Sequence, residues 1–475
     1  MAPFRNIARW MMVMTNFPVR HLDLVVPLAH KATAMRTTDT AGLETQARSG
    51  AVSPLIDASL RQGDVDSTIR RSTPLTLIMP GIRISITATR TTTTRTTRLE
   101  PEPSADQTER PHADFLFEDL VQAYLDCRQT KRNSASALAF EQSLEANLCR
   151  LDEELRKGTY RPGKSICFVI TRPKPREVWA ADFRDRIVHH LLYNRISPRF
   201  YASFIADSCA CIPGRGTLYA AQRLEAKIRS ATQNWSKPIW YLKCDLANFF
   251  VSIDKNILRE LIACRVTEPW WMQLADLILF HDPRQDFELR GSPHMLDLVP
   301  AHKRLANHPA HLGLPIGNLS SQFFANIYLN ELDQFIKHQI GAKHYIRYVD
   351  DFLLLNESPQ WLNAAKYDIE EFLRDKLAAK LNPTKTILQP VERGVDFVGQ
   401  VIRPWHRTTR KRTVNEAMSR VREIDAKDLF ETANSYYGLL RQTKSHHVRA
   451  RLSNILRYRG QTISGDLTKT YRRPA

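Results

Sequence analysis

The chain has 475 residues, 43% of them hydrophobic, and its 68 Lys and Arg against 50 Asp and Glu give a formal net charge of +18. This length suffices for two or three packed subdomains, and the charge favours a polyanionic partner bound in a salt-sensitive way. A ribosomal or membrane-surface protein would fit the charge equally well, but no apolar run approaches a transmembrane span. Seven cysteines without a CxxC pair predict a reduced, cytoplasmic chain without structural zinc.

The N-terminal part differs from the rest of the chain. Residues 89–99 are a low-complexity run rich in threonine and arginine, and Pro101–Ser104 has the composition of a linker. We predict that residues 1–110 form a basic, disordered extension without a stable core. Two interpretations stay open, namely an arm that binds nucleic acid and an overlong reading frame whose true start lies downstream.

Order is predicted to return at Phe115, and basic residues follow in two blocks. Lys174 and Arg176 alternate with prolines, and Arg215 is flanked by two glycines, which let a loop fold over a ligand. Ammonium and guanidinium groups are the usual partners of phosphate oxygens, so all three residues are candidates for binding a triphosphate. The alternative for each is a solvated surface charge.

The next informative segment is strand-like. Residues 240–254 form an apolar run that carries an acid, Asp245, followed by Phe249 and Phe250. One of the two phenylalanines must face the core, and strand alternation alone does not say which. Further along, Pro315–Gly317 form a turn before an apolar pattern with helical spacing, which predicts a helix from Asn318 to about Gln339. Gly317, before this helix, allows either close backbone approach to a ligand or turn geometry alone.

Two adjacent acids then interrupt an apolar run. Asp350 and Asp351 lie between Tyr345–Tyr348 and Phe352–Leu355, and a tight hairpin would present both carboxylates at its tip. A solvated turn is the alternative, since Asp is common in turns. With Asp245, however, three carboxylates could hold two divalent cations for an in-line phosphoryl transfer, and Mg²⁺ takes such oxygens together with water and substrate phosphate.

The C-terminal part is basic and helical. Lys385 follows the hairpin and either protonates a leaving pyrophosphate or lines a template groove. Four of the six residues 407–412 are basic, and residues 415–440 have a helical pattern.

These blocks, in this order over about residues 114–445, resemble successive motifs of a reverse transcriptase, with Tyr348–Asp351 as its catalytic box. The resemblance implies an α+β, right-hand polymerase fold. We expect fingers over residues 114–237, a palm with an antiparallel sheet over 238–403, and a helical thumb over 404–475, after the extension of 1–110. The implied activity is RNA-directed DNA polymerisation, with template RNA, a primer–template duplex and deoxynucleoside triphosphates as partners and no membrane.

The resemblance also implies roles for single residues. The family spacing favours Phe250 as the side chain that stacks under the incoming sugar and rejects a 2′-hydroxyl. Two Mg²⁺ ions, for which Mn²⁺ can substitute, are expected at Asp245, Leu246, Asp350 and Asp351. The three aspartates and Lys385 are the expected catalytic residues, and the expected nucleotide-binding residues are Lys174, Arg176, Arg215, Phe250, Ile316, Gly317 and Gln322.

One block of residues indicates which group of reverse transcriptases the chain resembles. Most reverse transcriptases carry Gln-Gly and end in Ser-Pro where this chain has Ile316-Gly317 and Ser321-Gln322. This variant resembles the reverse transcriptases of diversity-generating retroelements, which copy a template RNA with errors at adenines and work with a small basic accessory protein. An isoleucine offers shape without a hydrogen bond, which weakens discrimination against mispairs; the alternative is a core residue that opens the helix. A retron or phage-defence enzyme and, further away, an inactive RNA-binding protein are the rival hypotheses.

Overall fold

The computed structural model describes residues 75–79, 82–86, 112–131, 134–172 and 174–471. The chain divides into two compact units, Arg20–Gln107 and the remainder. In the smaller unit, β1 (Leu75–Met79) and β2 (Ile82–Ile86) form an antiparallel pair. Apart from this pair, the extension predicted over residues 1–110 lies outside the described residues.

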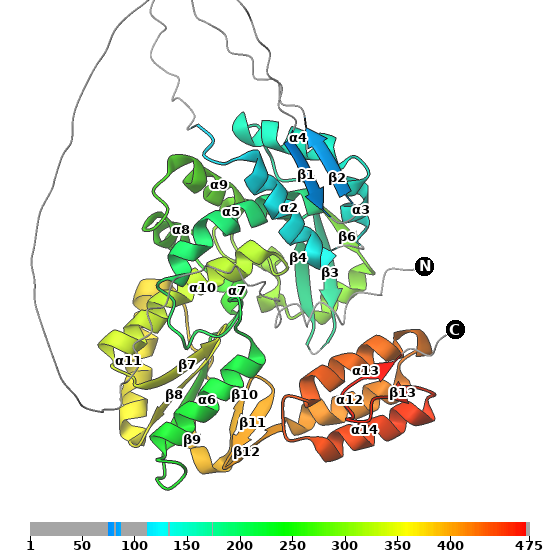
Figure 1. The fold of residues 1–475 in the computed structure, drawn as a ribbon. Coiled ribbons are helices and arrows are strands. Elements are labelled where there is room, and N and C mark those ends of the chain that lie inside the picture. Colours follow the sequence, from blue (N-terminus) through cyan, green and yellow to red (C-terminus); the bar gives the residue numbers. More distant parts are fainter. Residues whose placement is uncertain (1–74, 80–81, 87–111, 132–133, 173, 472–475) are drawn as a thin grey trace, which may run out of the picture. The chain divides into compact units, whose positions relative to one another are not determined.

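The larger unit begins with helices and a small sheet (Figure 1). Strand β3 pairs antiparallel with β4 and parallel with β6, which comes from far along the chain. Helix α5 follows β4 directly, and Asp182 caps it by accepting a hydrogen bond from the Arg184 N–H. The elements are α2 (Phe117–Lys131), α3 (Ala135–Glu141), α4 (Leu144–Arg156), β3 (Ser165–Ile170), β4 (Arg176–Ala180), α5 (Phe183–Tyr201), α6 (Thr217–Ala231) and β6 (Phe287–Arg290).

The second sheet is fully antiparallel, with the strand order β7-β8-β5-β9. Its strands are β5 (Trp240–Asp245), β7 (His344–Tyr348), β8 (Asp351–Asn356) and β9 (Ile387–Pro390). Successive side chains of a strand point to opposite faces. Leu353 accordingly packs in one cluster with Leu224 of α6, whereas Leu354 packs in another with Ile369 of α11 (Pro359–Leu377). The sheet is therefore buried on both faces.

The helix predicted from Asn318 to about Gln339 is confirmed. Helix α10 spans Leu319–Gln334, with Asn318 at its N-cap position, and continues as a π-helical segment, η4 (Phe335–Gln339). Between β5 and α10 lie α7 (Phe249–Ser252), α8 (Lys255–Ala263), α9 (Pro269–Phe280) and, after β6, three short 3₁₀ segments, η1 (Pro293–Leu298), η2 (Ala301–Lys303) and η3 (Leu305–Asn307). Leu305 packs with Trp179 and Val251, which anchors this segment to β4 and α7.

The C-terminal part consists of a three-stranded antiparallel sheet and three helices with a hydrophobic cluster of their own. The helical pattern over 415–440 belongs to two helices, because Ile424 and Asp425 adopt extended backbone angles between them. The elements are η5 (Val391–Arg393), β10 (Val395–Phe397), β11 (Gln400–Arg403), β12 (His406–Thr409), α12 (Lys411–Glu423), α13 (Ala426–Leu440), α14 (His446–Tyr458), β13 (Thr462–Ile463) and β14 (Thr470–Tyr471).

The hydrophobic core does not follow the predicted domain boundaries. One cluster joins Leu120 of α2, Ile187 of α5 and Leu354 of β8, on both sides of residue 237. The boundary at 403/404 falls between β11 and β12 of one sheet. The fold is mixed α+β, as predicted, while the domain limits stay predictions. Among the described helices, none is long and apolar enough to cross a bilayer.

Candidate active site

Three carboxylates meet where strands of the central sheet end. Tyr348 pairs with Asp351 across the β7–β8 hairpin, which leaves Val349 and Asp350 as its turn. Asp245, at the end of β5, pairs with the same Asp351 from the other side. The predicted hairpin is therefore confirmed. The term acidic site denotes Asp245, Asp350 and Asp351 below.

The acidic site is crowded and poorly hydrated. Asp245 is 5% exposed, and Asp350 and Asp351 are half-buried. Burial, together with the negative charges of Asp245 and Asp351, raises the pKa of Asp350 to about 6. Burial also raises the pKa of Asp351, against which the neighbouring Lys243 acts. Three carboxylates in one place therefore need a compensating cation to ionise together.

Two lysines supply part of that compensation. Lys385 Nζ lies 2.5 Å from Asp245 Oδ1, and its role as a general acid or as a template contact stays a prediction. Lys243 Nζ lies 3.7 Å from Asp351 Oδ2 and donates to the Asp396 carbonyl at 3.1 Å. The sequence analysis missed Lys243, although it stands two residues before Asp245 on the same strand and must share its face.

The donor set fits magnesium by its chemistry. Within the described ranges, no group of three His, Cys, Asp or Glu side chains is already arranged as a metal site. The acidic site nevertheless offers the carboxylate oxygens that Mg²⁺ takes, and the raised pKa of Asp350 reports negative charge that a cation would offset. Leu246, the fourth predicted ligand, forms a bridge with Leu381, in which the hydrogen bonds use Asp245 O and Ala247 N. Leu246 would act through its carbonyl.

The structure separates the two phenylalanines that follow Asp245. Phe249 is 3% exposed in the core, whereas Phe250 is only partly buried and packs against the outside of that core. Their ring centroids are 5.4 Å apart. The ring that can contact a ligand is thus Phe250, as predicted, and its part in sugar selection stays a prediction.

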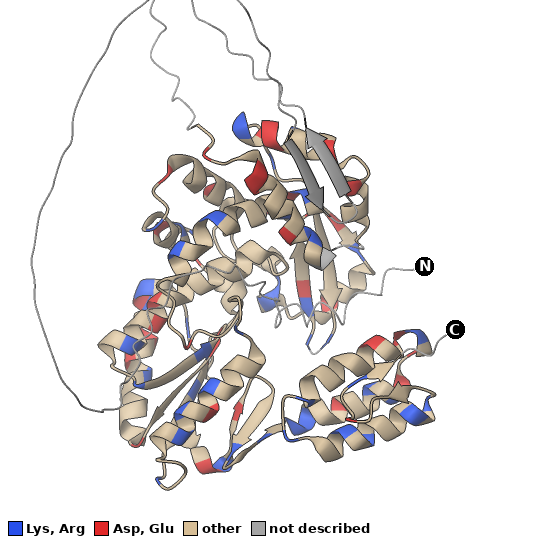
Figure 2. Cartoon of the chain, viewed as in Figure 1, with Lys and Arg blue, Asp and Glu red and all other residues tan. Residues whose placement is uncertain are grey.

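Cations gather opposite the acids. Lys174 and Arg176 are exposed where β3 and β4 meet, in the hairpin called the fingers hairpin below. Partial desolvation lowers the pKa of Lys174, and four positive charges lower it further, those of Lys385, Lys303, Arg412 and Arg176. Lys303, on η2, was not identified from the sequence, where no pattern marks it. Elsewhere Lys and Arg are interspersed with acids over the described chain (Figure 2).

The comparisons with known proteins agree with this geometry. Residues 171–402 match the family model described as reverse transcriptase (RNA-dependent DNA polymerase). The chain contains a reverse transcriptase domain. The matched range includes the acidic site, Lys385, Lys174 and Arg176, and the domain is that of an RNA-directed DNA polymerase. A search of curated proteins gave no match.

Solved telomerase structures share similarity with the reverse transcriptase domain at low identity. Telomerase from Candida albicans, in complex with a TWJ fragment of telomeric RNA, is 12% identical over 68% of this chain and 60% of its own, with a TM-score of 0.36. Apo telomerase from Candida tropicalis is 14% identical over 62% of this chain and 56% of its own, with a TM-score of 0.40. The chain thus spans less than two thirds of these telomerases, and no property of telomerase is transferred to it.

In the reverse transcriptase domain, Arg215 is held by its own loop. Its Nη1 donates to the carbonyls of Ile205 and Ser208, both at 2.7 Å, and its guanidinium lies 5.9 Å from the ring centre of Tyr219. These contacts give Arg215 a structural role. Nucleotide binding by Arg215 stays a prediction, and it would use the guanidinium nitrogens other than Nη1.

The turn before α10 is hydrogen-bonded to β4. Trp179 N donates to Ile316 O at 2.7 Å, and a Cβ on Gly317 would lie 2.9 Å from Trp179 O at a φ of 135°. Glycine is therefore required by close approach to β4 and by backbone geometry together. Ile316 is half-buried, so it is not the core residue that the alternative interpretation expected. Gln322, also half-buried, lies in the first turns of α10.

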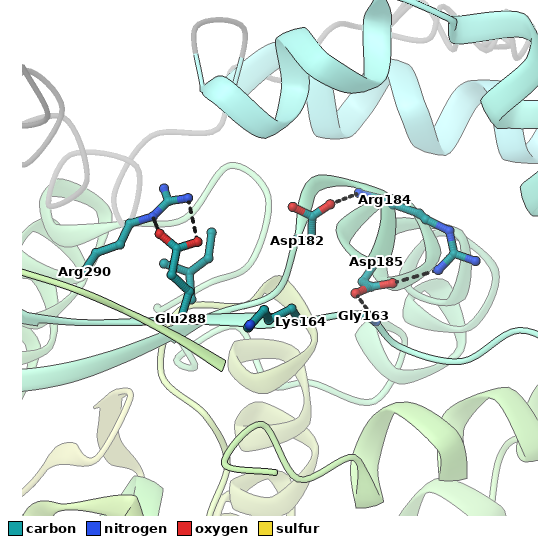
Figure 3. Close-up of a pocket in the computed structure, with 8 residues that line it drawn as sticks. Gly163, Lys164, Asp182, Arg184, Asp185, Glu288 and Arg290 are labelled. Carbon is teal, nitrogen blue, oxygen red and sulfur yellow. Dashed lines mark hydrogen bonds and ion pairs between the residues drawn. The ribbon is translucent and has the colours of Figure 1, made fainter. Parts of the chain in front are cut away.

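A separate polar cavity of about 200 Å³ lies between β3, β6 and the start of α5 (Figure 3). Asp185 accepts hydrogen bonds from Gly163 N and Tyr160 Oη at 2.8 Å each, and Arg290 pairs with Glu288 at 2.9 Å. None of its lining residues is a predicted site residue. Its charges largely neutralise one another, which makes it a structural feature of this sheet.

Proposed function

We propose that the chain copies an RNA template into DNA by nucleotidyl transfer assisted by two Mg²⁺ ions at the acidic site. The observation that carries the proposal is the convergence of Asp245, Asp350 and Asp351 beside Lys385. Bound metal would supply charge neutralisation and a more acidic primer hydroxyl. The chain's own residues would hold the metal, position the nucleotide through the fingers hairpin, and donate a proton from Lys385.

Primer extension on an RNA template with Mg²⁺ tests this proposal. We expect the wild-type chain to incorporate deoxynucleotides, and Asp350→Asn or Asp351→Asn to lower the rate by about 10³-fold, since several kcal/mol of charge stabilisation are lost. Asp375→Asn is the matched control, because Asp375 pairs only locally with Arg374 on α11 at 2.7 Å. Incorporation that survives both active-site substitutions would show that the metal site is wrong.

We further propose that copying is error-prone at adenines and serves a diversity-generating retroelement. The Ile316-Gly317 and Ser321-Gln322 block supports this proposal, because isoleucine cannot hydrogen-bond around the nascent base pair. A small basic accessory protein is then the expected partner. Sequencing the products made on an adenine-containing template tests the error spectrum, and two flanking DNA repeats that differ at adenines would identify the retroelement. Uniform, low error at all four bases would favour the retron or phage-defence alternative.

A further inference from the structure

Arg347 of β7 forms a buried ion pair next to the turn of the β7–β8 hairpin, which carries Asp350 and is called the acidic turn below. Arg347 and Asp333 of α10 are both fully buried. Arg347 Nε donates to Asp333 Oδ1 at 2.8 Å, and Nη2 donates to Oδ2 at 2.7 Å, so the pair is bidentate. A buried ion pair is often no more stabilising than apolar residues of the same volume. Its presence here is therefore better explained by the geometry it imposes than by the stability it adds.

The remaining N–H groups of this guanidinium donate to three further residues. Nη1 donates to Val349 O at 3.1 Å and to Asn326 Oδ1 of α10 at 3.2 Å. Nη2 donates to Ser208 Oγ at 2.8 Å. One rigid, planar group thus ties α10 and the loop around Ser208 to the turn of the β7–β8 hairpin.

Val349 is the residue whose backbone conformation most needs to be held by such a hydrogen bond. Its φ is 56°, a value that β-branched residues rarely adopt, and it directly precedes Asp350. The surrounding structure must hold a residue in this region, because it would otherwise relax. The only side-chain hydrogen bond that the described structure gives Val349 O comes from Arg347.

The loop beside β7 also contacts Arg347, through main-chain hydrogen bonds. Arg347 N donates to Asp207 O, and Cys209 N donates to Arg347 O, both at 2.9 Å. Tyr345 Oη, two residues earlier on β7, donates to Asp333 Oδ1 at 2.7 Å. Tyr345 therefore shares the partner of Arg347 but makes no contact with the turn, which makes it a matched control.

We propose that Arg347 is a positioning residue for the acidic site: its guanidinium, oriented by Asp333, holds Val349 O and thereby fixes the turn that presents Asp350 and Asp351 to the metal ions. This inference rests on the proposed function. A lysine cannot replace Arg347, because one ammonium cannot bind Asp333 in bidentate fashion and reach Val349 O as well.

The test compares Arg347→Lys with Tyr345→Phe. For Arg347→Lys we expect kcat to fall about 30- to 100-fold, the order of loss that a misplaced reacting group causes, with the deoxynucleotide KM within about 3-fold of wild type. The Mg²⁺ concentration for half-maximal rate should rise, and Mn²⁺ binding in isothermal titration calorimetry should weaken. Tyr345→Phe should lower the melting temperature and leave kcat and both metal measurements unchanged.

The outcomes separate this inference from the proposed function. A folded Arg347→Lys with wild-type kcat and wild-type Mn²⁺ binding overturns the inference, even if the wild-type chain polymerises as proposed. A wild-type chain that does not polymerise overturns the proposed function, while weaker Mn²⁺ binding by Arg347→Lys still supports the positioning role. If Arg347→Lys does not fold, Asn326→Ser removes one guanidinium partner and keeps the bidentate pair. It should weaken Mn²⁺ binding in the same direction, and unchanged binding overturns the inference.

Discussion

The β7–β8 hairpin and the fingers hairpin present opposite charges in different ways. The acidic turn is half-buried and is held from inside by Arg347, which has five hydrogen bonds to side chains and to Val349 O. Lys174 and Arg176, by contrast, are exposed and form no ion pair with any described residue. A metal site requires oxygens fixed before the metal arrives, whereas phosphate-binding cations can be ordered by the phosphate itself.

This difference predicts where substitutions will act. Changes around the acidic turn should affect kcat and the metal dependence, because they alter groups at the reacting atoms. Changes in the fingers hairpin should affect the nucleotide KM, because they remove contacts that stabilise the bound substrate and the transition state equally.

Apart from the aspartates of the acidic site, the largest effect is expected at Lys385. Replacement by Met should lower kcat about 100-fold with little change in KM, because the proton donor beside Asp245 is removed. Lys385→Arg keeps the charge but cannot give up a proton at neutral pH. Single-turnover primer extension distinguishes the two roles: equal losses in both variants indicate a general acid, and recovery of the rate in Lys385→Arg would indicate a template contact instead.

The fingers hairpin should show the opposite pattern. Lys174→Gln and Arg176→Gln should each raise the deoxynucleotide KM about 10- to 30-fold and leave kcat within about 2-fold, since each removes a charge-assisted hydrogen bond to phosphate. Steady-state kinetics measure both constants. Lys164→Gln is the control, because Lys164 is an exposed lysine at the other end of β3, 3.6 Å from Asp286. A fall in kcat at constant KM would contradict the contrast drawn between the two hairpins.

The pH dependence concerns Asp350. Its pKa in the fold is about 6, above its ordinary value of 3.8, so the folded state holds this proton more tightly than the unfolded state does. Without metal, stability should therefore fall as pH rises from about 4 to about 6. Mg²⁺ binds the carboxylate, so the apparent Mg²⁺ affinity should be about 10-fold weaker at pH 5 than at pH 7.

Thermal unfolding with EDTA or increasing Mg²⁺ at pH 5, 6 and 7 measures both effects. Asp350→Asn should weaken the metal-free pH trend in this window, because Asn does not titrate, whereas Asp351, whose pKa is also raised, still does. An Mg²⁺ affinity that is equal at pH 5 and pH 7 would show that Asp350 is ionised at both pH values and that its burial does not affect Mg²⁺ binding.

The smallest effect is expected at Ile316. Ile316→Gln should reduce misincorporation opposite adenine by about 3- to 10-fold, since a hydrogen-bonding side chain replaces one that offers only shape. The rate of correct incorporation should stay near wild type, because Ile316 is fastened to Trp179 through its main-chain oxygen, which glutamine also has. Product sequencing measures the spectrum, and an unchanged spectrum would end this interpretation of Ile316.

The parts of the fold that sequence could predict are local. The β7–β8 hairpin follows from apolar residues on either side of Asp350 and Asp351, and α10 follows from helical spacing after Asn318. In both cases the hydrophobic pattern and the residues that mark the turn or the start of the helix lie within a few residues of each other. Lys243 was within reach by the same reasoning, because alternation places it on the face of Asp245.

The parts that sequence could not predict depend on distant contacts. Arg347 reads as a polar residue in a strand, and its role needs Ser208, 139 residues away, and Asp333 on another element. The parallel pairing of β6 with β3 likewise joins segments separated by five helices and two strands. No local period reports such pairings, and a parallel pair needs a long connection whose path the sequence does not state.

The separate hydrophobic clusters have a consequence for how the protein loses its structure on heating. The core that contains Leu120 and Leu354 links the first helices to the central sheet, whereas Tyr437 and Leu452 belong to a cluster built only by the C-terminal helices. Cooperative unfolding follows shared cores. Scanning calorimetry should therefore resolve two endotherms. The acidic site and the first helices would melt together in one of them, and α12–α14 would melt in the other.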